Sequence, residues 1–230
     1  MNSPEPEDFP PLELATPDGL IAIGGDLSAE RLIKAYQNGI FPWYSPGDPI
    51  LWWTPDPRCV LFPENFKVSR SLTKSIQNKG FEFHLDRTFP AVISQCASLR
   101  ENEGTWITDE MKQSYCHLQS LGFAHSVETW QDGKLVGGLY GIALGGVFFG
   151  ESMFSLVTDA SKAALAFLVN QLSHWGFSVI DCQVTSAHLL SLGAEEISRS
   201  DFMKNLESAL KLPGRPGCWT DKEVVISRGD

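Results

Sequence analysis

The segment from residue 124 to residue 155 constrains the fold more than any other part of the chain. It reads AHSVETWQDGKLVGGLYGIALGGVFFGESMFS, with turn dipeptides at Asp132-Gly133 and Gly145-Gly146 between runs of strand-forming residues. Both dipeptides suit the tight turns that join antiparallel neighbours. The pattern therefore predicts an antiparallel meander, with strands over residues 124–131, 134–144 and 146–151.

A helix and a further strand follow the meander directly. Apolar residues at helical spacing, after a capping Thr158 or Asp159, predict a helix over residues 159–175, and Gly176 then leads into a strand over residues 178–184. Meander, helix and strand in this order resemble the core of an N-acyltransferase-like (GNAT-like) fold. The class expected is therefore α+β with a mixed, largely antiparallel sheet. The other elements predicted beyond residue 66 are a strand over residues 81–85 and helices over residues 69–79, 88–101, 108–121 and 200–210.

The beginning of the chain differs in composition from the rest. From Phe9 to Pro57 it is rich in Pro, Gly and Trp and contains one clear helix, which Ser28 caps and Gly39 ends. The block GIFPWYSPGDPILWWTPDPRCVLFP contains too many prolines for a long helix or a central strand, so ordered loops and short strands are expected there. We expect a small N-terminal domain over residues 1–57 and an acyltransferase-like catalytic domain over residues 58–230.

Charge is distributed unevenly along the chain. The net charge of −10 argues against nucleic acid as a partner, because binding a polyanion depends on Lys and Arg. However, residues 1–30 contain seven acidic residues and no Lys or Arg, whereas residues 58–80 have a net charge of +4. Within that window Arg70, Lys74 and Lys79 are candidates for contact with nucleic acid, and the alternative is an ordinary solvated helix surface.

Several classes of protein are disfavoured by what the sequence lacks. It has no apolar run long enough to span a membrane, and its N-terminus is acidic where a secretory signal is basic, so we expect a cytoplasmic protein without a membrane partner. The five cysteines are widely spaced and form no C-x-x-C motif, which predicts reduced thiols, mostly buried, and neither a disulfide framework nor a metal site. An enzyme that uses acetyl-coenzyme A needs a glycine-rich turn to hold pyrophosphate at a helix N-terminus. The corresponding SLVTDASK has no glycine, so no cofactor is expected.

The strand predicted over residues 178–184 carries unusual polar residues. Its alternation places Val179, Asp181 and Gln183 on one face. A buried carboxylate is costly unless it is paired, so these residues form either a structural hydrogen-bond network or a polar functional site. Glu151, at the end of the neighbouring strand, favours a site. The motif GESMFS is not a nucleophile elbow around Ser152, because it lacks the second glycine and follows a meander strand.

Several motifs together point to one family. In chain order they are GDLS, GIFPWYSPGDPILWW followed by TPDPR, EGTWIT, LVGGLYG, GESMFS, and IDCQ with SLGA behind it. With these motifs the sequence resembles the leucyl/phenylalanyl-tRNA–protein transferases from about Phe9 to about Trp219. The resemblance implies an aminoacyltransferase that moves leucine or phenylalanine, and less well methionine, from aminoacyl-tRNA to the α-amine of proteins with N-terminal Arg or Lys. The product is an N-degron for proteolysis, and we expect the enzyme to be a monomer.

The resemblance implies two binding regions for the donor. Trp43 and Trp106 would hold the 3′-terminal adenosine, because stacking of a base on an aromatic ring contributes about 1–3 kcal/mol. Core filling is the alternative for any tryptophan, and it is the expectation for the others considered, namely Trp52, Trp53 and Trp175. An apolar pocket would hold the aminoacyl side chain and disfavour β-branched side chains by shape. Its lining, which would equally suit an ordinary core, is Leu139, Phe148, Met153, Leu165 and Leu168.

The resemblance also implies catalytic roles for Asp181, Gln183 and Glu151. The oxygen of the Gln183 side chain would accept a hydrogen bond from the attacking α-amine, and Asp181 would orient and polarise that amide. Glu151 and Asp181 would offer negative charge to the N-terminal Arg or Lys. Arg70, Lys74 and Lys79 would contact the tRNA.

Three rival functions are consistent with the sequence. One is N-acetylation of small amines, which the missing diphosphate turn disfavours. The second is an enzyme that uses another class of donor. The third is a non-catalytic module that binds aminoacyl-tRNA or N-degrons, which the Asp181 and Gln183 pair disfavours.

Overall fold

The computed structural model describes residues 8–99 and 106–220. Its main sheet has seven strands in the order β10-β4-β9-β8-β7-β6-β5. Within it β8 and β9 are parallel, whereas the other neighbouring pairs are antiparallel. The strands are β4 (Arg58–Leu61), β5 (Glu82–Leu85), β6 (Ala124–Gln131), β7 (Lys134–Leu144), β8 (Val147–Ser155), β9 (Val179–Gln183) and β10 (Glu195–Ile197).

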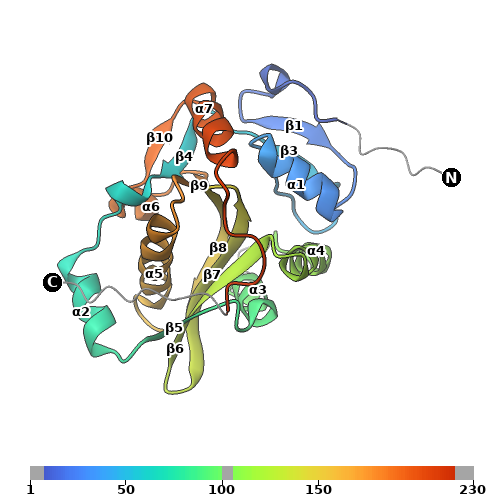
Figure 1. The fold of residues 1–230 in the computed structure, drawn as a ribbon. Coiled ribbons are helices and arrows are strands. Elements are labelled where there is room, and N and C mark those ends of the chain that lie inside the picture. The colour runs from blue at the N-terminus through green and yellow to red at the C-terminus, as the bar shows by residue number, and fades with distance from the viewer. Residues whose placement is uncertain (1–7, 100–105, 221–230) are drawn as a thin grey trace.

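A smaller sheet lies in the N-terminal region, beside helix α1 (Ala29–Gln37) (Figure 1). Its strands run in the order β1 (Leu20–Ile23), β3 (Leu51–Trp53) and β2 (Phe41–Pro42). Short 3-10 helices occupy Leu12–Leu14 and Pro63–Asn65. Leu32 and Tyr36 of α1 belong to the same hydrophobic cluster as one face of the main sheet. The N-terminal region and the main sheet therefore share a core, and the domain division at residues 57 and 58 stays a prediction.

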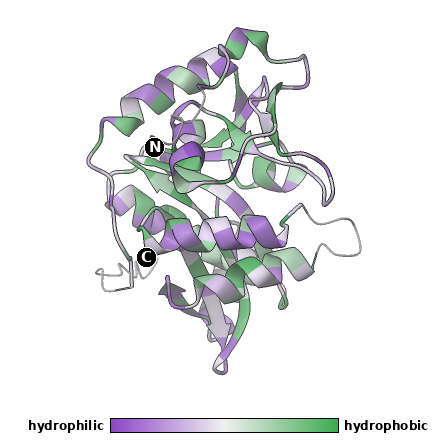
Figure 2. Ribbon diagram, turned by 90° about the vertical axis from the view of Figure 1, so that its right-hand side faces the viewer, coloured by the Kyte–Doolittle hydropathy of each residue, from purple (hydrophilic) through white to green (hydrophobic). Residues whose placement is uncertain are grey.

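Helices cover both faces of the main sheet (Figure 1). On one face α3 (Phe89–Ser98), α4 (Asp109–Ser120) and α7 (Arg199–Leu210) contribute to the core shared with the N-terminal region. On the other face α5 (Ala160–His174) packs into a second hydrophobic cluster. Helix α2 (Arg70–Asn78) lies outside this cluster. Hydropathy follows this arrangement, with largely hydrophobic strands inside and helices that are hydrophilic on part of their surface (Figure 2). The described helices include none that is both long and apolar enough to cross a membrane.

These elements confirm the expected α+β class, with a small N-terminal region and a mixed, largely antiparallel sheet. The prediction that the third meander strand ends at residue 151 is wrong, because β8 stays paired with β7 as far as Ser155. Two short elements were not predicted, namely β10 and helix α6 (Ala187–Ser191). The last residues of the helix predicted over residues 88–101 lie outside the described residues.

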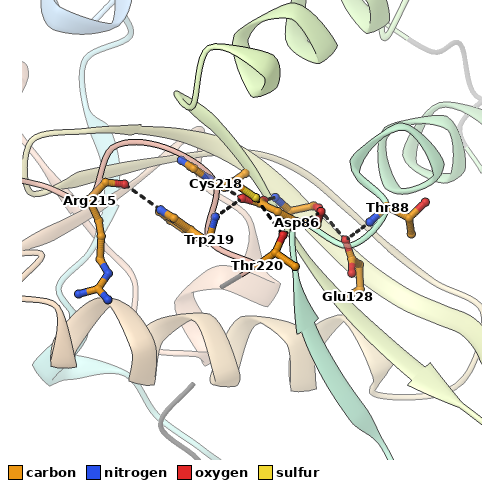
Figure 3. Close-up of polar contacts among 9 residues, drawn as sticks. Asp86, Thr88, Glu128, Arg215, Cys218, Trp219 and Thr220 are labelled. Atoms are coloured by element: carbon orange, nitrogen blue, oxygen red, sulfur yellow. Dashed lines mark hydrogen bonds and ion pairs between the residues drawn. The ribbon is translucent and has the colours of Figure 1, made fainter. Parts of the chain in front are cut away.

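The chain after α7 is fastened to the sheet by Trp219 (Figure 3). Its fully buried indole stacks on the imidazole of His125 at a centroid distance of 3.7 Å. Asp86 Oδ2 accepts hydrogen bonds from the backbone N of Trp219 (2.9 Å) and from His125 Nδ1 (2.8 Å). The Trp219 indole N–H donates to the carbonyl of Arg215 at 2.8 Å. Through Asp86, which directly follows β5, and His125 of β6, this network therefore anchors the C-terminal segment to the sheet.

Candidate active site

A cavity of about 390 Å³ lies where strands β8 and β9 part. The two strands are paired in parallel from Val147 and Val179 to Phe149 and Asp181, and the pairing ends there. The cavity is lined by residues one or two positions beyond this last pair, namely Gly150, Glu151 and Gln183. Ligands in open α/β sheets commonly bind at such carboxyl ends of parallel strands. The splitting of the sheet therefore creates the site.

A β-bulge on β8 positions Glu151. Tyr140 and Gly141 of β7 pair with Ser152 and Gly150, which leaves Glu151 as the extra residue. Gly141 is required there, because a Cβ at this position would lie 2.2 Å from the carbonyl oxygen of Phe149. A bulge changes which face the following side chains point to. As a result the Glu151 side chain lies on the face of the sheet that α3 and α4 cover, whereas Met153 lies on the face that α5 covers. Both residues nevertheless line the same cavity.

Glu151 is buried among hydrogen-bond donors. Its Oε1 accepts from Tyr36 Oη (2.7 Å) and from Gln183 Nε2 (2.9 Å), and its Oε2 accepts from Tyr115 Oη (3.0 Å). Burial raises the pKa of Glu151 to about 7, because loss of solvent outweighs these three donors. The carboxyl group therefore keeps its proton to a higher pH than an exposed glutamate does. The two tyrosines come from α1 and α4, and nothing in the sequence pattern pointed to them.

Asp181 forms a fully buried ion pair with Arg58 of β4. Arg58 Nε donates to Oδ1 (2.8 Å) and Nη2 to Oδ2 (2.7 Å), and the guanidinium lies between the rings of Phe41 and Phe202. Arg58, which contributes to the net charge of residues 58–80, is therefore not available at the surface, since the side chain is only 1% exposed. Because the charge of Asp181 is paired and lies outside the cavity lining, the expectation that it offers negative charge to an acceptor is wrong.

Gln183 is held by two separate carboxylates. Its backbone N donates to Asp181 Oδ1 at 2.9 Å, whereas its side-chain amide donates to Glu151. The expectation that Asp181 polarises the side-chain amide is therefore wrong, because Glu151 occupies that position. Gln183 has a φ of +64°, a conformation that residues other than glycine rarely adopt. Asp181 thus holds the backbone of Gln183 in a strained conformation, which is common at functional sites.

Trp43 and Trp106 both line the cavity. Trp43 is 46% exposed, although its ring lies near that of Trp53, and Trp106 is half-buried. Trp52, by contrast, is fully buried, as expected of a core residue. The two tryptophans singled out from the sequence are thus placed where a planar group could reach them from solvent.

The structure brings the five residues expected in the apolar pocket to the same cavity. They come from β7, β8 and α5, and they are Leu139, Phe148, Met153, Leu165 and Leu168. The lining residues that were missed include Cys182 of β9 and His188 of α6. Burial and the nearby charge of Lys162 lower the pKa of His188. The only sequence signal for His188 was its position between IDCQ and SLGA.

The basic residues expected to contact tRNA are not part of the cavity lining. Arg70 and Lys74 are exposed on α2, outside α5. Lys79, which caps α2, donates from Nζ to the carbonyl of Thr158 at 2.7 Å. Arg70 and Lys74 therefore do not contribute to the cavity itself.

The sequence matches two family models. The model of the leucyl/phenylalanyl-tRNA protein transferase matches residues 60–207, and that of the N-terminal domain of the same transferase matches residues 25–56. The chain belongs to this family. A relative from Methylococcus capsulatus, named leucyl/phenylalanyl-tRNA–protein transferase, is 56% identical over 94% of this chain and 93% of its own length. A relative of the same name from Nitrosospira multiformis is 57% identical over 94% of this chain and 95% of its own length.

Solved structures with similar folds are much more distant in sequence. A GCN5-related N-acetyltransferase from Kribbella flavida matches 72% of this chain and 60% of its own, with a TM-score of 0.42 and 13% identity. L-PGS from Bacillus licheniformis matches 70% of this chain and 52% of its own, with a TM-score of 0.41 and 12% identity. At this level of similarity neither structure bears on the substrates of the present family member.

Proposed function

We propose that this protein transfers leucine or phenylalanine from aminoacyl-tRNA to the α-amine of proteins with N-terminal Arg or Lys, and thereby creates an N-degron. The observation that supports this most directly is the composition of one cavity. It combines two solvent-accessible tryptophans, a group of apolar side chains and the Glu151 and Gln183 pair. A donor with a base, an aliphatic or aromatic side chain and a reactive carbonyl needs these three surfaces next to one another.

The donor would occupy the cavity from its mouth inward. The terminal adenine stacks on Trp43 and Trp106, which contributes about 1–3 kcal/mol without any demand on the rest of the tRNA sequence. The leucine or phenylalanine side chain enters the apolar part, where Leu165 and Leu168 of α5 face Phe148 of β8. Arg70, Lys74 and Lys79 would contact the acceptor stem outside the cavity.

The acceptor would meet the ester at Gln183. Since Gln183 Nε2 donates to Glu151, the Oε1 atom is the one left to accept a hydrogen bond from the α-amine. The amine nitrogen attacks the carbonyl carbon, a C–N bond forms, the ester C–O bond breaks and the terminal ribose hydroxyl leaves with a proton. Holding the amine against an ester that is already activated can lower the barrier by about 7–11 kcal/mol.

Glu151 would have two functions in this scheme. It fixes the orientation of the Gln183 amide, and in its ionised form it offers negative charge to an N-terminal Arg or Lys. Asp181 and Arg58 would act indirectly, because Asp181 holds the Gln183 backbone and Arg58 holds Asp181. Cytoplasmic localisation and a monomeric state stay predictions.

The test is transfer with defined substrates. The protein is mixed with Leu-tRNA and a peptide that begins with Arg, and mass spectrometry monitors addition of leucine. A peptide with an acetylated α-amine and one that begins with Gly serve as controls, and Val-tRNA tests the shape of the pocket. The proposal predicts leucine addition to the Arg peptide alone and little transfer from Val-tRNA. Folded protein that adds no leucine to the Arg peptide would overturn it.

A further inference from the structure

Two cysteines lie next to one another at the wall of the cavity. Cys182 of β9 lines the cavity directly, whereas Cys59 of β4 is fully buried behind it. Both are free thiols. The proposed transfer reaction uses neither of them, so their proximity requires a separate explanation.

A second β-bulge brings these cysteines together. Cys59 pairs with Gln183 and Val60 with Asp181, so Cys182 is the extra residue and also lies opposite Cys59. Both side chains belong to the α5 side of the sheet, in or against the same hydrophobic cluster. Opposed Cα atoms in an antiparallel pair are about 4.5–5.5 Å apart, and disulfides span about 4.4–6.8 Å. The backbone separation is therefore suitable for a disulfide.

The surroundings of the two sulfur atoms differ. The Cys182 thiol and, to a smaller extent, the Thr185 hydroxyl lower the pKa of Cys59 by hydrogen bonding. The pKa of Cys182 is raised by the same contact with Cys59 and by burial. The two thiols are thus in contact with each other, and Cys182 is the one that lines the cavity, where a small oxidant can reach it.

We propose that Cys59 and Cys182 form an oxidisable dithiol site in the cavity wall, which peroxide converts to a disulfide. Peroxide oxidises the Cys182 thiol to a sulfenic acid and is itself reduced to water. The sulfur of Cys59 then attacks the sulfenic sulfur, the S–S bond forms, and a second molecule of water leaves. The net reaction consumes one peroxide and two thiols, and an added dithiol reduces the disulfide back to the two thiols while it is itself oxidised to a disulfide.

Formation of this disulfide would alter the part of the cavity wall that contains Gln183. Cys182 directly precedes Gln183, whose backbone has a positive φ and donates a hydrogen bond from its N–H to Asp181. A bond to Cys59 would fix the Cys182 sulfur against β4 and so restrict the backbone that presents the Gln183 amide to Glu151. Small misplacements of a positioning group can lower a rate by about a hundredfold, so oxidation should reduce transfer by more than about tenfold. This loss of activity rests on the proposed function, whereas the disulfide itself does not.

The experiment treats the full chain with hydrogen peroxide, blocks the remaining thiols, digests the protein and searches for the cross-linked peptides by mass spectrometry. Cys59→Ala removes the resolving thiol without touching the cavity lining, and Cys218→Ser removes an exposed thiol. We expect a linkage between Cys59 and Cys182 in the unaltered protein and in Cys218→Ser, with activity restored by dithiothreitol. We expect Cys59→Ala to form no such linkage and to show no loss of transfer that dithiothreitol restores.

Two results would overturn this proposal. One is a folded protein that forms no linkage between Cys59 and Cys182 under peroxide. The other is a linkage that leaves transfer unchanged while the reduced protein is active. If the reduced protein itself transfers no leucine, the proposed function fails, whereas the cross-link still decides whether the dithiol site exists.

Discussion

The buried carboxyl group of Glu151 makes stability depend on pH in a way that one substitution should remove. In the unfolded chain Glu151 has its ordinary pKa of 4.5, whereas in the folded protein its pKa is about 7. Between these values the folded protein keeps a proton that the unfolded chain has lost. Raising the pH through this window therefore lowers the free energy of unfolding, and the full loss, present above pH 7, is about 3 kcal/mol.

Glu151→Gln keeps the shape of the side chain and removes the titration. Urea denaturation of both proteins, measured from about pH 5 to about pH 8, gives the free energy of unfolding at each pH. Over this range the free energy of unfolding should fall by up to about 3 kcal/mol more in the unaltered protein than in Glu151→Gln. The contributions of groups that titrate in both proteins cancel in this comparison. Glu207→Gln, which changes an exposed glutamate of α7, is the matched control and should keep the original slope. Equal slopes in the unaltered protein and Glu151→Gln would refute the assignment.

Three further predictions follow from the site. Asp181→Asn should lower the free energy of unfolding by about 3–5 kcal/mol in chemical denaturation, because it leaves its buried arginine partner without a counter-ion; a variant of unchanged stability would contradict the ion pair. Trp43→Ala and Trp106→Ala should each raise the KM for aminoacyl-tRNA by about tenfold to a hundredfold or more, with melting temperatures retained, and normal KM values would place the adenosine elsewhere. Charge reversal at both Arg70 and Lys74 should weaken use of full-length tRNA and reduce its salt dependence, but leave an aminoacyl-adenosine donor unaffected; equal effects on both donors would exclude a contact with the stem.

The meander and its helix were predictable because their signals are local. Two turn dipeptides and a helical run of apolar residues determine the strands from 124 to 144 and the helix that became α5. Alternation also placed Val179, Asp181 and Gln183 on one face correctly, since Val179 packs on the α3 and α4 side, where Glu151 contacts Gln183.

The partners within the site were not predictable, because they depend on irregularities and distant contacts. Strict alternation would place Glu151 and Met153 on the same face, and only the bulge on β8 separates them. The pairing of Arg58 with Asp181 was not predicted, since nothing local indicates that β4 lies beside β9 inside the sheet. The hydroxyl groups of Tyr36 and Tyr115 reach Glu151 from helices far away in sequence.

The central claim is that one cavity holds the aminoacyl end of the donor against Gln183. A crystal structure with phenylalanyl-adenosine, linked by a stable amide in place of the ester, tests it most directly. The account predicts adenine in contact with Trp43 and Trp106, the phenyl ring between Phe148 and Leu168, and the carbonyl next to Gln183. Adenine bound away from both tryptophans, or a phenyl ring outside the apolar part of the cavity, would contradict it.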